Sequence, residues 1–177
     1  MIKFEKISKY ADVDILLPTR ATKDSAGYDF YVAEDVIILP YEINSINLLK
    51  EDNKNPKDFY TLDEIADLTK TAHARPTLVS TGVKCYLEPD TYLELVMRSS
   101  VPLKSLLVLA NGQGIIDSDY VDNPDTEGCI YFQILNLSPV PIKLKRGDRI
   151  GQGIIHHYLK TDDDNAEGVR VGGFGST

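Results

Sequence analysis

Residues 111–120, Asn-Gly-Gln-Gly-Ile-Ile-Asp-Ser-Asp-Tyr, decide how the rest of this chain is interpreted. Apolar runs rich in strand-forming residues flank them, residues 101–110 before and 129–137 after. The two glycines permit turns and let a ligand approach the main chain closely. The apolar pair that follows holds the next turn in a strand against a core, so Asp117 becomes a carboxylate on a rigid element. We therefore predict a hairpin that binds a flat ligand and places the carboxylate of Asp117 beside it.

The composition of the 177-residue chain is that of one ordinary globular domain, with 42% hydrophobic and 26% charged residues. The net charge of -8 argues against binding of nucleic acid or of a membrane surface, because both need a basic face. A small anionic ligand remains compatible, since it needs only local arginines and N–H groups. The sequence contains no signal-peptide core and no apolar run long enough to span a membrane. These features predict a cytoplasmic protein.

Many short strands at regular spacing predict an all-β fold, a barrel or jelly roll, over residues 1–160. Cys85 and Cys129 each lie in an apolar strand-like run, which predicts buried thiols. With three histidines and no CxxC or HxxxH pattern, a structural zinc site is not expected. The predicted strands cover residues 1–10, 26–33, 36–39, 78–87, 92–97, 103–110, 129–137, 142–145 and 149–159.

Residues 44–76 differ from the rest because they are polar and carry the helical signals of the chain. Thr61 and Glu64 form a capping box, in which the hydroxyl and the carboxylate cap the first turn of a helix. This pattern predicts an insertion in the β domain, with one short helix around residues 61–70.

Three residues that end the predicted strand 92–97 form a candidate oxyanion cradle. Arg98 offers a guanidinium, which binds phosphate in a bidentate fork, and Ser99 and Ser100 offer hydroxyl donors. The alternative is a solvated strand end, and the tripeptide alone leaves both interpretations open.

Residues 161–177 are interpreted as a flexible arm that closes over the active site. From Arg170 the arm ends in Arg-Val-Gly-Gly-Phe-Gly-Ser-Thr, and three glycines around one Phe have no use in a core. Phe174 can stack on a base, while Arg170, Ser176 and the glycine N–H groups can meet phosphates. The alternative is an unstructured terminus.

Asp117 is the leading catalytic candidate, because a carboxylate beside a water acts as general base for attack on phosphorus or carbon. Turn chemistry is the alternative, but the preceding glycines and the aromatic ring of Tyr120 favour catalysis. Asp29 is an acid in an apolar strand, which either orders the waters of a metal ion or pairs with an arginine. Gln152 faces either a site or a subunit contact.

Taken in order, five motifs resemble the trimeric dUTPase family (deoxyuridine 5′-triphosphate nucleotidohydrolases). The resemblance covers nearly the whole chain and is nearest to the dUTPases of low-GC Gram-positive bacteria and their phages, through Asn-Pro-Asp-Thr-Glu-Gly at residues 123–128. The matching segments are residues 26–29, 98–100, 111–120, 146–152 and 170–177.

The resemblance implies a jelly-roll-like β-barrel assembled as a homotrimer, with three active sites that each share motifs from all three subunits. It implies hydrolysis of dUTP to dUMP and pyrophosphate, with Asp117 deprotonating the water that attacks the α-phosphorus. Mg²⁺ would sit on the triphosphate, and Asp29 would reach it at most through water.

The remaining roles follow from the same resemblance. Asn111 and the backbone of the predicted hairpin would read the uracil edge, and Tyr120 would pack under the deoxyribose. Phe174 would cover the base, and Ser99 would lie near the α,β-bridging oxygen. The other residues that the resemblance assigns to substrate binding are Arg98, Ser100, Gly114, Ile115, Ile116, Gln152, Arg170, Gly175 and Ser176.

The chain departs from the family pattern at three places. Residues 44–76 are an insertion relative to the compact pattern. Val-Asp-Asn follows Tyr120, so Asp122 stands where many members have Gly. The arm has one residue fewer between Arg170 and Phe174 than many members have.

Two rival functions share some of these features. A dCTP deaminase has a related fold and also uses an Arg-Ser-Ser element, but it carries a general-base Glu in the strand after the central hairpin. Residues 130–134 contain no acid here, and the Phe-Gly-Ser-Thr arm favours hydrolysis. A non-enzymatic regulatory protein, which binds a partner protein through residues 44–76, is disfavoured by the set of Asp117, Tyr120 and Phe174. An added partner-binding role through the insertion stays open.

Overall fold

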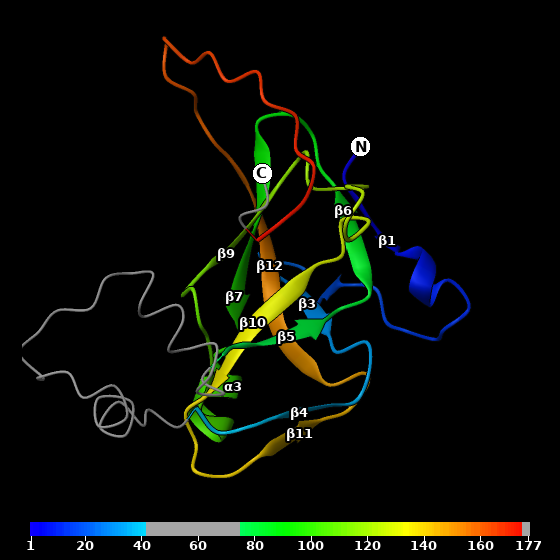
Figure 1. Cartoon of the computed structure of the whole chain (residues 1–177), viewed down its shortest axis with the longest axis vertical. Helices are drawn as coiled ribbons and strands as arrows, with labels where there is room; N and C mark the ends of the chain where they lie inside the picture. Colours follow the sequence, from blue (N-terminus) through cyan, green and yellow to red (C-terminus); the bar gives the residue numbers. More distant parts are fainter. Residues whose placement is uncertain (42–74, 175–177) are drawn as a thin grey trace, which may run out of the picture.

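The computed structural model describes residues 1–41 and 75–174, and regular structure in these ranges is almost entirely β (Figure 1). The predicted helix around residues 61–70 lies outside them. The strands are β1 (Lys3–Lys6), β2 (Thr19–Arg20), β3 (Tyr28–Tyr31), β4 (Val36–Ile38), β5 (Thr77–Ser80), β6 (Val83–Tyr86), β7 (Thr91–Met97), β8 (Leu107–Leu109), β9 (Gly114–Asp117), β10 (Tyr131–Asn136), β11 (Ile142–Leu144) and β12 (Arg149–His157). The helical elements are a 3₁₀ turn, η1 (Ser8–Tyr10), and one short helix, α3 (Ser100–Ser105).

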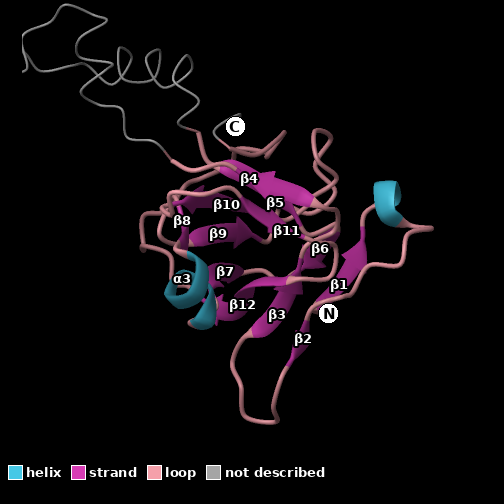
Figure 2. Cartoon of the chain, turned by 90° about the horizontal axis from the view of Figure 1, so that it is seen from below, coloured by secondary structure: helices cyan, strands magenta, loops and turns pink. Residues whose placement is uncertain are grey.

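The strands form four hydrogen-bonded sheets, whose paired strands run antiparallel (Figure 2). The largest sheet has the order β2-β3-β12-β7-β9, and a three-stranded sheet has the order β5-β10-β8. Two strand pairs, β1-β6 and β11-β4, complete the described part of the chain. The predicted all-β, jelly-roll-like architecture is confirmed, and the described strands form separate sheets without closing into one barrel.

The core lies between the two larger sheets because both follow the two-residue alternation of buried strands. In β7 the side chains of Leu93 and Leu95 are buried, and in β10 those of Phe132 and Ile134 are buried. Phe30 of β3 packs on Phe132 with the ring centroids 5.8 Å apart, which joins the two sheets. The opposite face of β10 carries Tyr131 and Gln133, and this second face matters for the site.

The prediction of one strand over residues 78–87 is wrong, because this segment forms β5 and β6. Gly82 stands between them with φ +68°, a left-handed conformation that turns the chain. As a result β5 pairs with β10 while β6 pairs with β1. A side chain at Gly82 would also place a Cβ 2.6 Å from Ile15 Cδ1.

The apolar run of residues 101–110 was predicted to be strand-forming, and its first half is instead the helix α3. None of the helix residues is buried, so their apolar character reflects an exposed surface rather than a core strand. Pro102 lies in the first turn, where its missing N–H costs nothing. Leu106 ends the helix in a left-handed conformation, with φ +54° and its N–H bonded to Pro102 O at 3.1 Å.

The strands on either side of residues 110–113 do not pair with each other, so the predicted hairpin is wrong in its pairing. β8 pairs with β10 in the three-stranded sheet, whereas β9 pairs with β7 in the five-stranded sheet. The chain therefore crosses from one sheet to the other at this point. The two strands diverge, and the space between them becomes the cavity described below.

Both cysteines are free and buried, as predicted. Burial raises the pKa of the Cys85 thiol to about 12, which keeps it protonated and unreactive near neutral pH. Within the described ranges, no helix has both the length and the apolar character needed to cross a bilayer.

Candidate active site

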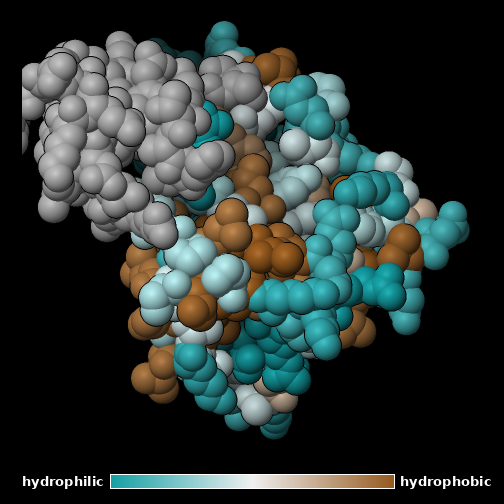
Figure 3. Space-filling view, turned by 60° about the horizontal axis from the view of Figure 1, so that its bottom comes forward, coloured by the Kyte–Doolittle hydropathy of each residue, from teal (hydrophilic) through white to brown (hydrophobic). Residues whose placement is uncertain are grey.

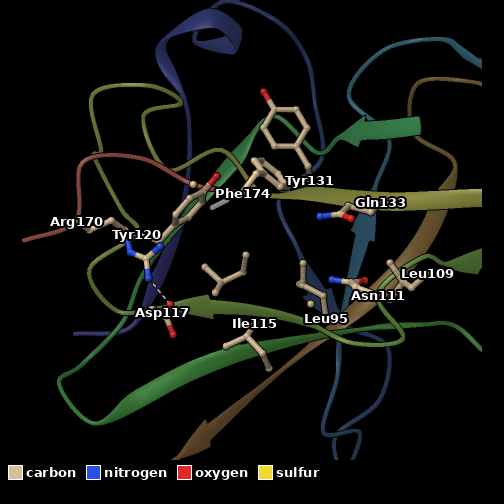
Figure 4. A pocket seen from close by; sticks show the side chains of 13 residues that line it. Leu95, Leu109, Asn111, Ile115, Asp117, Tyr120, Tyr131, Gln133, Arg170 and Phe174 are labelled. Carbon is tan, nitrogen blue, oxygen red and sulfur yellow. Dashed lines mark hydrogen bonds and ion pairs between the residues drawn. The ribbon is translucent and has the colours of Figure 1, made fainter. Parts of the chain in front are cut away.

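A cavity of about 200 Å³ lies where β8 and β9 diverge (Figure 4). β7 and β8 contribute apolar side chains, β9 contributes its whole length, and the end of the chain covers one side. The lining residues are Leu95, Leu109, Asn111, Gly114, Ile115, Ile116, Asp117, Tyr120, Tyr131, Gln133, Arg170, Gly173 and Phe174.

β9 places Asp117 at one end of this cavity. The strand lies close against β7 because Gly114 has no side chain: a Cβ there would lie 3.1 Å from Leu95 Cβ. Asp117 is the last residue of β9 and is opposite Tyr92 in the ladder, so its backbone is fixed while its carboxylate stays half exposed. A carboxylate held this way is accessible to a water molecule and to a ligand.

Arg170 closes on this carboxylate from the end of the chain. Its Nη2 donates a short hydrogen bond to Asp117 Oδ2, and its Nε donates to Asp119 Oδ1 at 2.8 Å. The guanidinium carbon also lies 6.0 Å from the centroid of the Tyr120 ring. The arm is therefore anchored at the acid by one arginine that spans two carboxylates.

Tyr120 is 6% exposed and is fixed at both ends of its side chain. Its hydroxyl donates to the Cys129 carbonyl at 3.0 Å and accepts a hydrogen bond from Thr126 Oγ1 at 3.1 Å. Asn123 Nδ2 donates to the Tyr120 carbonyl at 2.7 Å. Burial raises the pKa of the Tyr120 hydroxyl, so it stays neutral and its ring forms a rigid wall of the cavity.

The segment after Tyr120, residues 121–128, is held by ion pairs with β6 and by hydrogen bonds from η1. Lys84, which is largely buried, donates to Asp122 Oδ1 at 2.5 Å and to Glu127 Oε1 at 3.0 Å. The Ser8 hydroxyl and N–H both donate to Glu127 Oε2, and these bonds lower the pKa of the Glu127 carboxyl to about 2.

Asp122 explains how the chain tolerates its departure from the family pattern. It has φ +57°, the left-handed conformation that glycine adopts most easily. Its carboxylate is held by Lys84 and by the hydroxyl of Tyr86, at 2.9 Å. The backbone geometry expected of Gly is thus adopted here by an Asp whose side chain is fixed.

The arm lies over the cavity through Gly173 and Phe174. A Cβ at Gly173 would lie 2.8 Å from Tyr120 Cε2, so the backbone of the arm packs directly on the Tyr120 ring. Phe174 contacts Tyr131 edge-on, with ring centroids 6.0 Å apart, and is itself 57% exposed. Gly175 and Ser176 lie outside the described residues.

The structure divides the predicted site residues into two sets. The first, which we call the cavity group, meets in the cavity; the second, the strand-end group, does not line it. The cavity group is Asn111, Gly114, Ile115, Ile116, Asp117, Tyr120, Arg170 and Phe174, and the strand-end group is Arg98, Ser99, Ser100 and Gln152.

Two members of the strand-end group, Arg98 and Gln152, lie beside Asp29, which is 5% exposed. Arg98 Nε lies 3.0 Å from Asp29 Oδ1, and Arg149 Nη1 lies 3.5 Å from Oδ2. Of the two roles that the sequence left open for Asp29, the structure therefore contains the pairing with arginine. Gln152 lies beside it on β12, opposite Asp29 in the ladder, and its side chain packs where a Cβ of Gly27 would otherwise stand.

Ser100 lines a different cavity, of about 260 Å³. Lys104 of α3 and Arg149 at the start of β12 line the same space, together with the carboxylate of Asp148. Two cations and a hydroxyl gather here, which is a composition that suits phosphate oxygens.

Tyr131 and Gln133 line the main cavity, and sequence reasoning missed both as site residues. Their spacing along β10 was a usable signal, because residues two apart in a strand share a face. Nothing in the local pattern shows which face of that strand meets the cavity. That depends on the packing of β10 beside β8 and opposite β9.

The described residues contain no group of three or more His, Cys, Asp or Glu side chains arranged to hold a metal ion. Both oxygens of Asp29 already face guanidinium groups. Asp117 and Asp119 are partly exposed near the cavity, where they share Arg170.

The fold and this cavity define a class: a jelly-roll-like β protein with a carboxylate, a rigid aromatic wall and a covering arm, as suits a small anionic ligand. The dUTPase family model matches residues 60–177. A deoxyuridine 5′-triphosphate nucleotidohydrolase of Lactococcus lactis subsp. lactis is 35% identical over 176 residues, 98% of this chain and 95% of the relative. The chain belongs to the dUTPase family.

One solved structure agrees with this assignment, and a second shares the fold. The dUTPase of Streptococcus mutans is 34% identical, with a TM-score of 0.68, and the match covers 90% of this chain and 98% of that one. A dUTPase mutant from phage phi11 of S. aureus, whose structure reveals the coordination of a structural Mg(II) ion, is 18% identical. Its TM-score is 0.60 over 95% of this chain and 97% of that one, which indicates a similar fold. The resemblance to Gram-positive bacterial dUTPases is thereby confirmed.

Proposed function

We propose that this protein hydrolyses dUTP to dUMP and pyrophosphate. The observation that carries the proposal is the cavity in which Asp117, Tyr120 and the arm residues meet. Membership of the dUTPase family and the 35% identical Lactococcus relative support the same activity. The cavity offers a carboxylate at one end and amides between apolar walls at the other, which suits a nucleotide (Figure 4).

In the proposed reaction Asp117 orients a water molecule and takes its proton as the oxygen attacks the α-phosphorus. The bond from the α-phosphorus to the α,β-bridging oxygen breaks, and pyrophosphate leaves with the bonding electrons. Tyr120 packs under the deoxyribose, where its fixed ring leaves little room for a 2′-hydroxyl. Phe174 covers the base from the arm.

Arg170 is paired with Asp117 in this structure, so substrate binding must separate them. A triphosphate offers the guanidinium stronger bidentate partners than two partly exposed carboxylates do. We therefore infer that Arg170 transfers to the phosphates when dUTP binds, which leaves Asp117 free to accept a proton.

Mg²⁺ is proposed to enter on the triphosphate of the substrate. This ion favours oxygen ligands and is commonly held by substrate phosphates with few protein carboxylates. When bound, it would neutralise charge that develops on the leaving pyrophosphate. Asp29 would contribute at most through water, because two guanidinium groups occupy its oxygens.

A homotrimer is proposed to complete the site. Arg98, Ser99 and Ser100, which the family resemblance assigns to phosphate binding, do not line the cavity that contains Asp117. A second copy would have to supply them. The end of the molecule around α3, β4 and β11 exposes apolar side chains, as a subunit contact would (Figure 3). They include Ile37, Leu39, Leu103, Leu106, Leu137 and Val140.

Deamination of dCTP is not favoured. The deaminase pattern requires a general-base Glu in the strand that follows the central stretch, and that strand is β10. The β10 side chains that line the cavity are Tyr131 and Gln133, neither of which is an acid.

The decisive experiment incubates the purified protein and Mg²⁺ with dUTP, dTTP, UTP and dCTP in parallel and identifies the products. Release of dUMP and pyrophosphate from dUTP alone is expected. Ammonia from dCTP would instead indicate deamination and would overturn the proposal.

A further inference from the structure

The end of the cavity that lies away from Asp117 contains two side-chain amides, from Asn111 and Gln133 (Figure 4). Neither amide has a hydrogen-bond partner among residues 1–41 and 75–174. Asn111 lies between the side chains of Leu95 and Leu109 (Figure 4). Asn111 is exposed to solvent, whereas Gln133 is half buried, and a half-buried amide normally has a hydrogen-bond partner. The missing partner of Gln133 in the cavity therefore indicates that a ligand supplies it.

Gln133 is held more firmly than a surface glutamine. It lies in the middle of β10, opposite Leu78 of β5, and its carbonyl accepts a hydrogen bond from the Ala110 N–H at 2.9 Å. That bond also fixes the start of the segment that carries Asn111. The two amides are therefore positioned by one piece of backbone, which is the kind of support that a recognition site needs.

The position of Asp117 sets the direction in which a nucleotide would lie. Asp117 and Arg170 are at one end of the cavity, Tyr120 stands along its side, and Asn111 and Gln133 are at the other end (Figure 4). A nucleotide with its α-phosphorus beside Asp117 and its sugar on Tyr120 must direct its base toward the two amides.

We propose that Gln133 is a specificity-determining residue that contacts the O4 and N3–H edge of the pyrimidine with its side-chain amide, beside Asn111. This inference rests on the proposed function, and it deepens it by assigning a base contact to a side chain of β10. An amide offers one donor and one acceptor side by side, which matches the acceptor O4 and the donor N3–H of uracil.

The test combines a protein change with a ligand change. Gln133→Met keeps the length of the side chain and removes its polar groups. The ligands are dUTP and the analogue with a 2-pyrimidinone base, which lacks O4 and N3–H. We expect the variant to lose roughly tenfold or more in kcat/KM for dUTP and less than about twofold for the analogue. Equal losses of kcat/KM for dUTP and for the analogue would overturn the inference about Gln133. The proposed function would still stand in that case, provided that the wild-type protein hydrolyses dUTP.

Gln113→Met is the matched control, because Gln113 does not line the cavity and bonds instead to Glu94. It should leave both rates unchanged. Failure of the wild-type protein to hydrolyse dUTP would reject the proposed function itself, which is a separate outcome.

A second variant decides the matter if Gln133→Met does not fold. Gln133→Glu keeps the shape but presents only acceptors, which suit the amino group of cytosine better than O4 of uracil. Calorimetric binding of dUMP and dCMP should then move toward dCMP by at least about tenfold relative to the wild type. An unchanged ratio of the two affinities would contradict a base contact by Gln133.

Discussion

The cavity group and the strand-end group both come from motifs that resemble one family, yet the chain holds them in different ways. The cavity group gathers around Asp117 in a space that one chain forms by itself. The strand-end group does not line that space, and its arginine, Arg98, is paired with the buried carboxylate of Asp29. The difference teaches that one chain brings Asp117, the Tyr120 ring and Arg170 together by itself, whereas it holds the strand-end group apart from them.

The largest effect should come from Asp117→Asn. This change removes the proposed base and keeps the shape of the side chain, so turnover of dUTP should fall by about a thousandfold, within the range measured for general bases. Binding of dUTP should be retained, because the amide still fits. Steady-state rates and calorimetric binding check both parts, and turnover near the wild-type level would remove Asp117 from the mechanism.

Mixing two inactive variants tests whether the two groups act across subunits. Asp117→Asn disables the cavity group, and Arg98→Ala disables the strand-end group. If each site takes the two groups from different copies, random mixed trimers should regain about a quarter of the wild-type activity.

The mixture is prepared by unfolding and refolding the two variants together, and separately refolded samples mixed afterwards serve as the control. No gain in the co-refolded sample would show that each copy supplies both groups to its own site.

Stability should distinguish the two arginines that pair with Asp29. Arg98→Ala leaves the buried Asp29 with one distant partner and should lower the free energy of unfolding by about 2 kcal/mol. Arg149→Ala should cost less, since its guanidinium is farther away, at 3.5 Å, and its side chain is half exposed. Denaturant unfolding measures both, and equal losses would contradict the role assigned to Arg98.

A smaller effect is expected where the arm meets the cavity group. Gly173→Ala would place a methyl 2.8 Å from Tyr120 Cε2 and push the arm off the ring. We expect kcat/KM for dUTP to fall by roughly tenfold, because the cover over the sugar is misplaced. Gly168→Ala is the matched control, since a Cβ there meets nothing within 4 Å. Similar losses in both variants would point to a general effect on the tail.

The smallest effect concerns the segment that supports Tyr120. The Glu127 pKa is lowered to about 2 from 4.5, so its ionised form stabilises the fold fully above pH 4.5. That stabilisation is lost as the pH falls through about 2. Glu127→Gln should therefore lower the melting temperature by about 3 °C at pH 7 and by nothing near pH 2. A difference that persists at pH 2 would mean that the contact is not ionic.

Much of the site could be predicted from the sequence because its chemistry is local. The order of residues 111–120 placed two glycines, an apolar pair and Asp117 within one turn and one strand, and the structure keeps that geometry. The pairing of β8 and β9 could not be predicted in this way. Apolar alternation shows that a segment is a strand, but both neighbours of the turn fit equally well in one sheet or in two.

The prediction of a strand over the whole of residues 101–110 is wrong for a related reason. Its apolar residues match a buried strand, and periodicity alone does not separate a short buried strand from a short exposed helix. Here Pro102 fits the first turn of α3, and Leu106 ends the helix in a left-handed conformation. At Asp122, which stands where many family members have Gly, contacts with Lys84 and Tyr86 accompany a left-handed backbone.

The sequence by itself determined the all-β class, the order of the five motifs and the carboxylate, Asp117, that lines the cavity. These depend on alternation, turn residues and residue chemistry, which are properties of short segments. Only the tertiary structure decided that β8 and β9 diverge, that Gln133 faces the space between them, and that Arg98 is bound to Asp29 outside it. Each of these depends on hydrogen bonds and ion pairs between residues far apart in the chain, and no short segment contains that information.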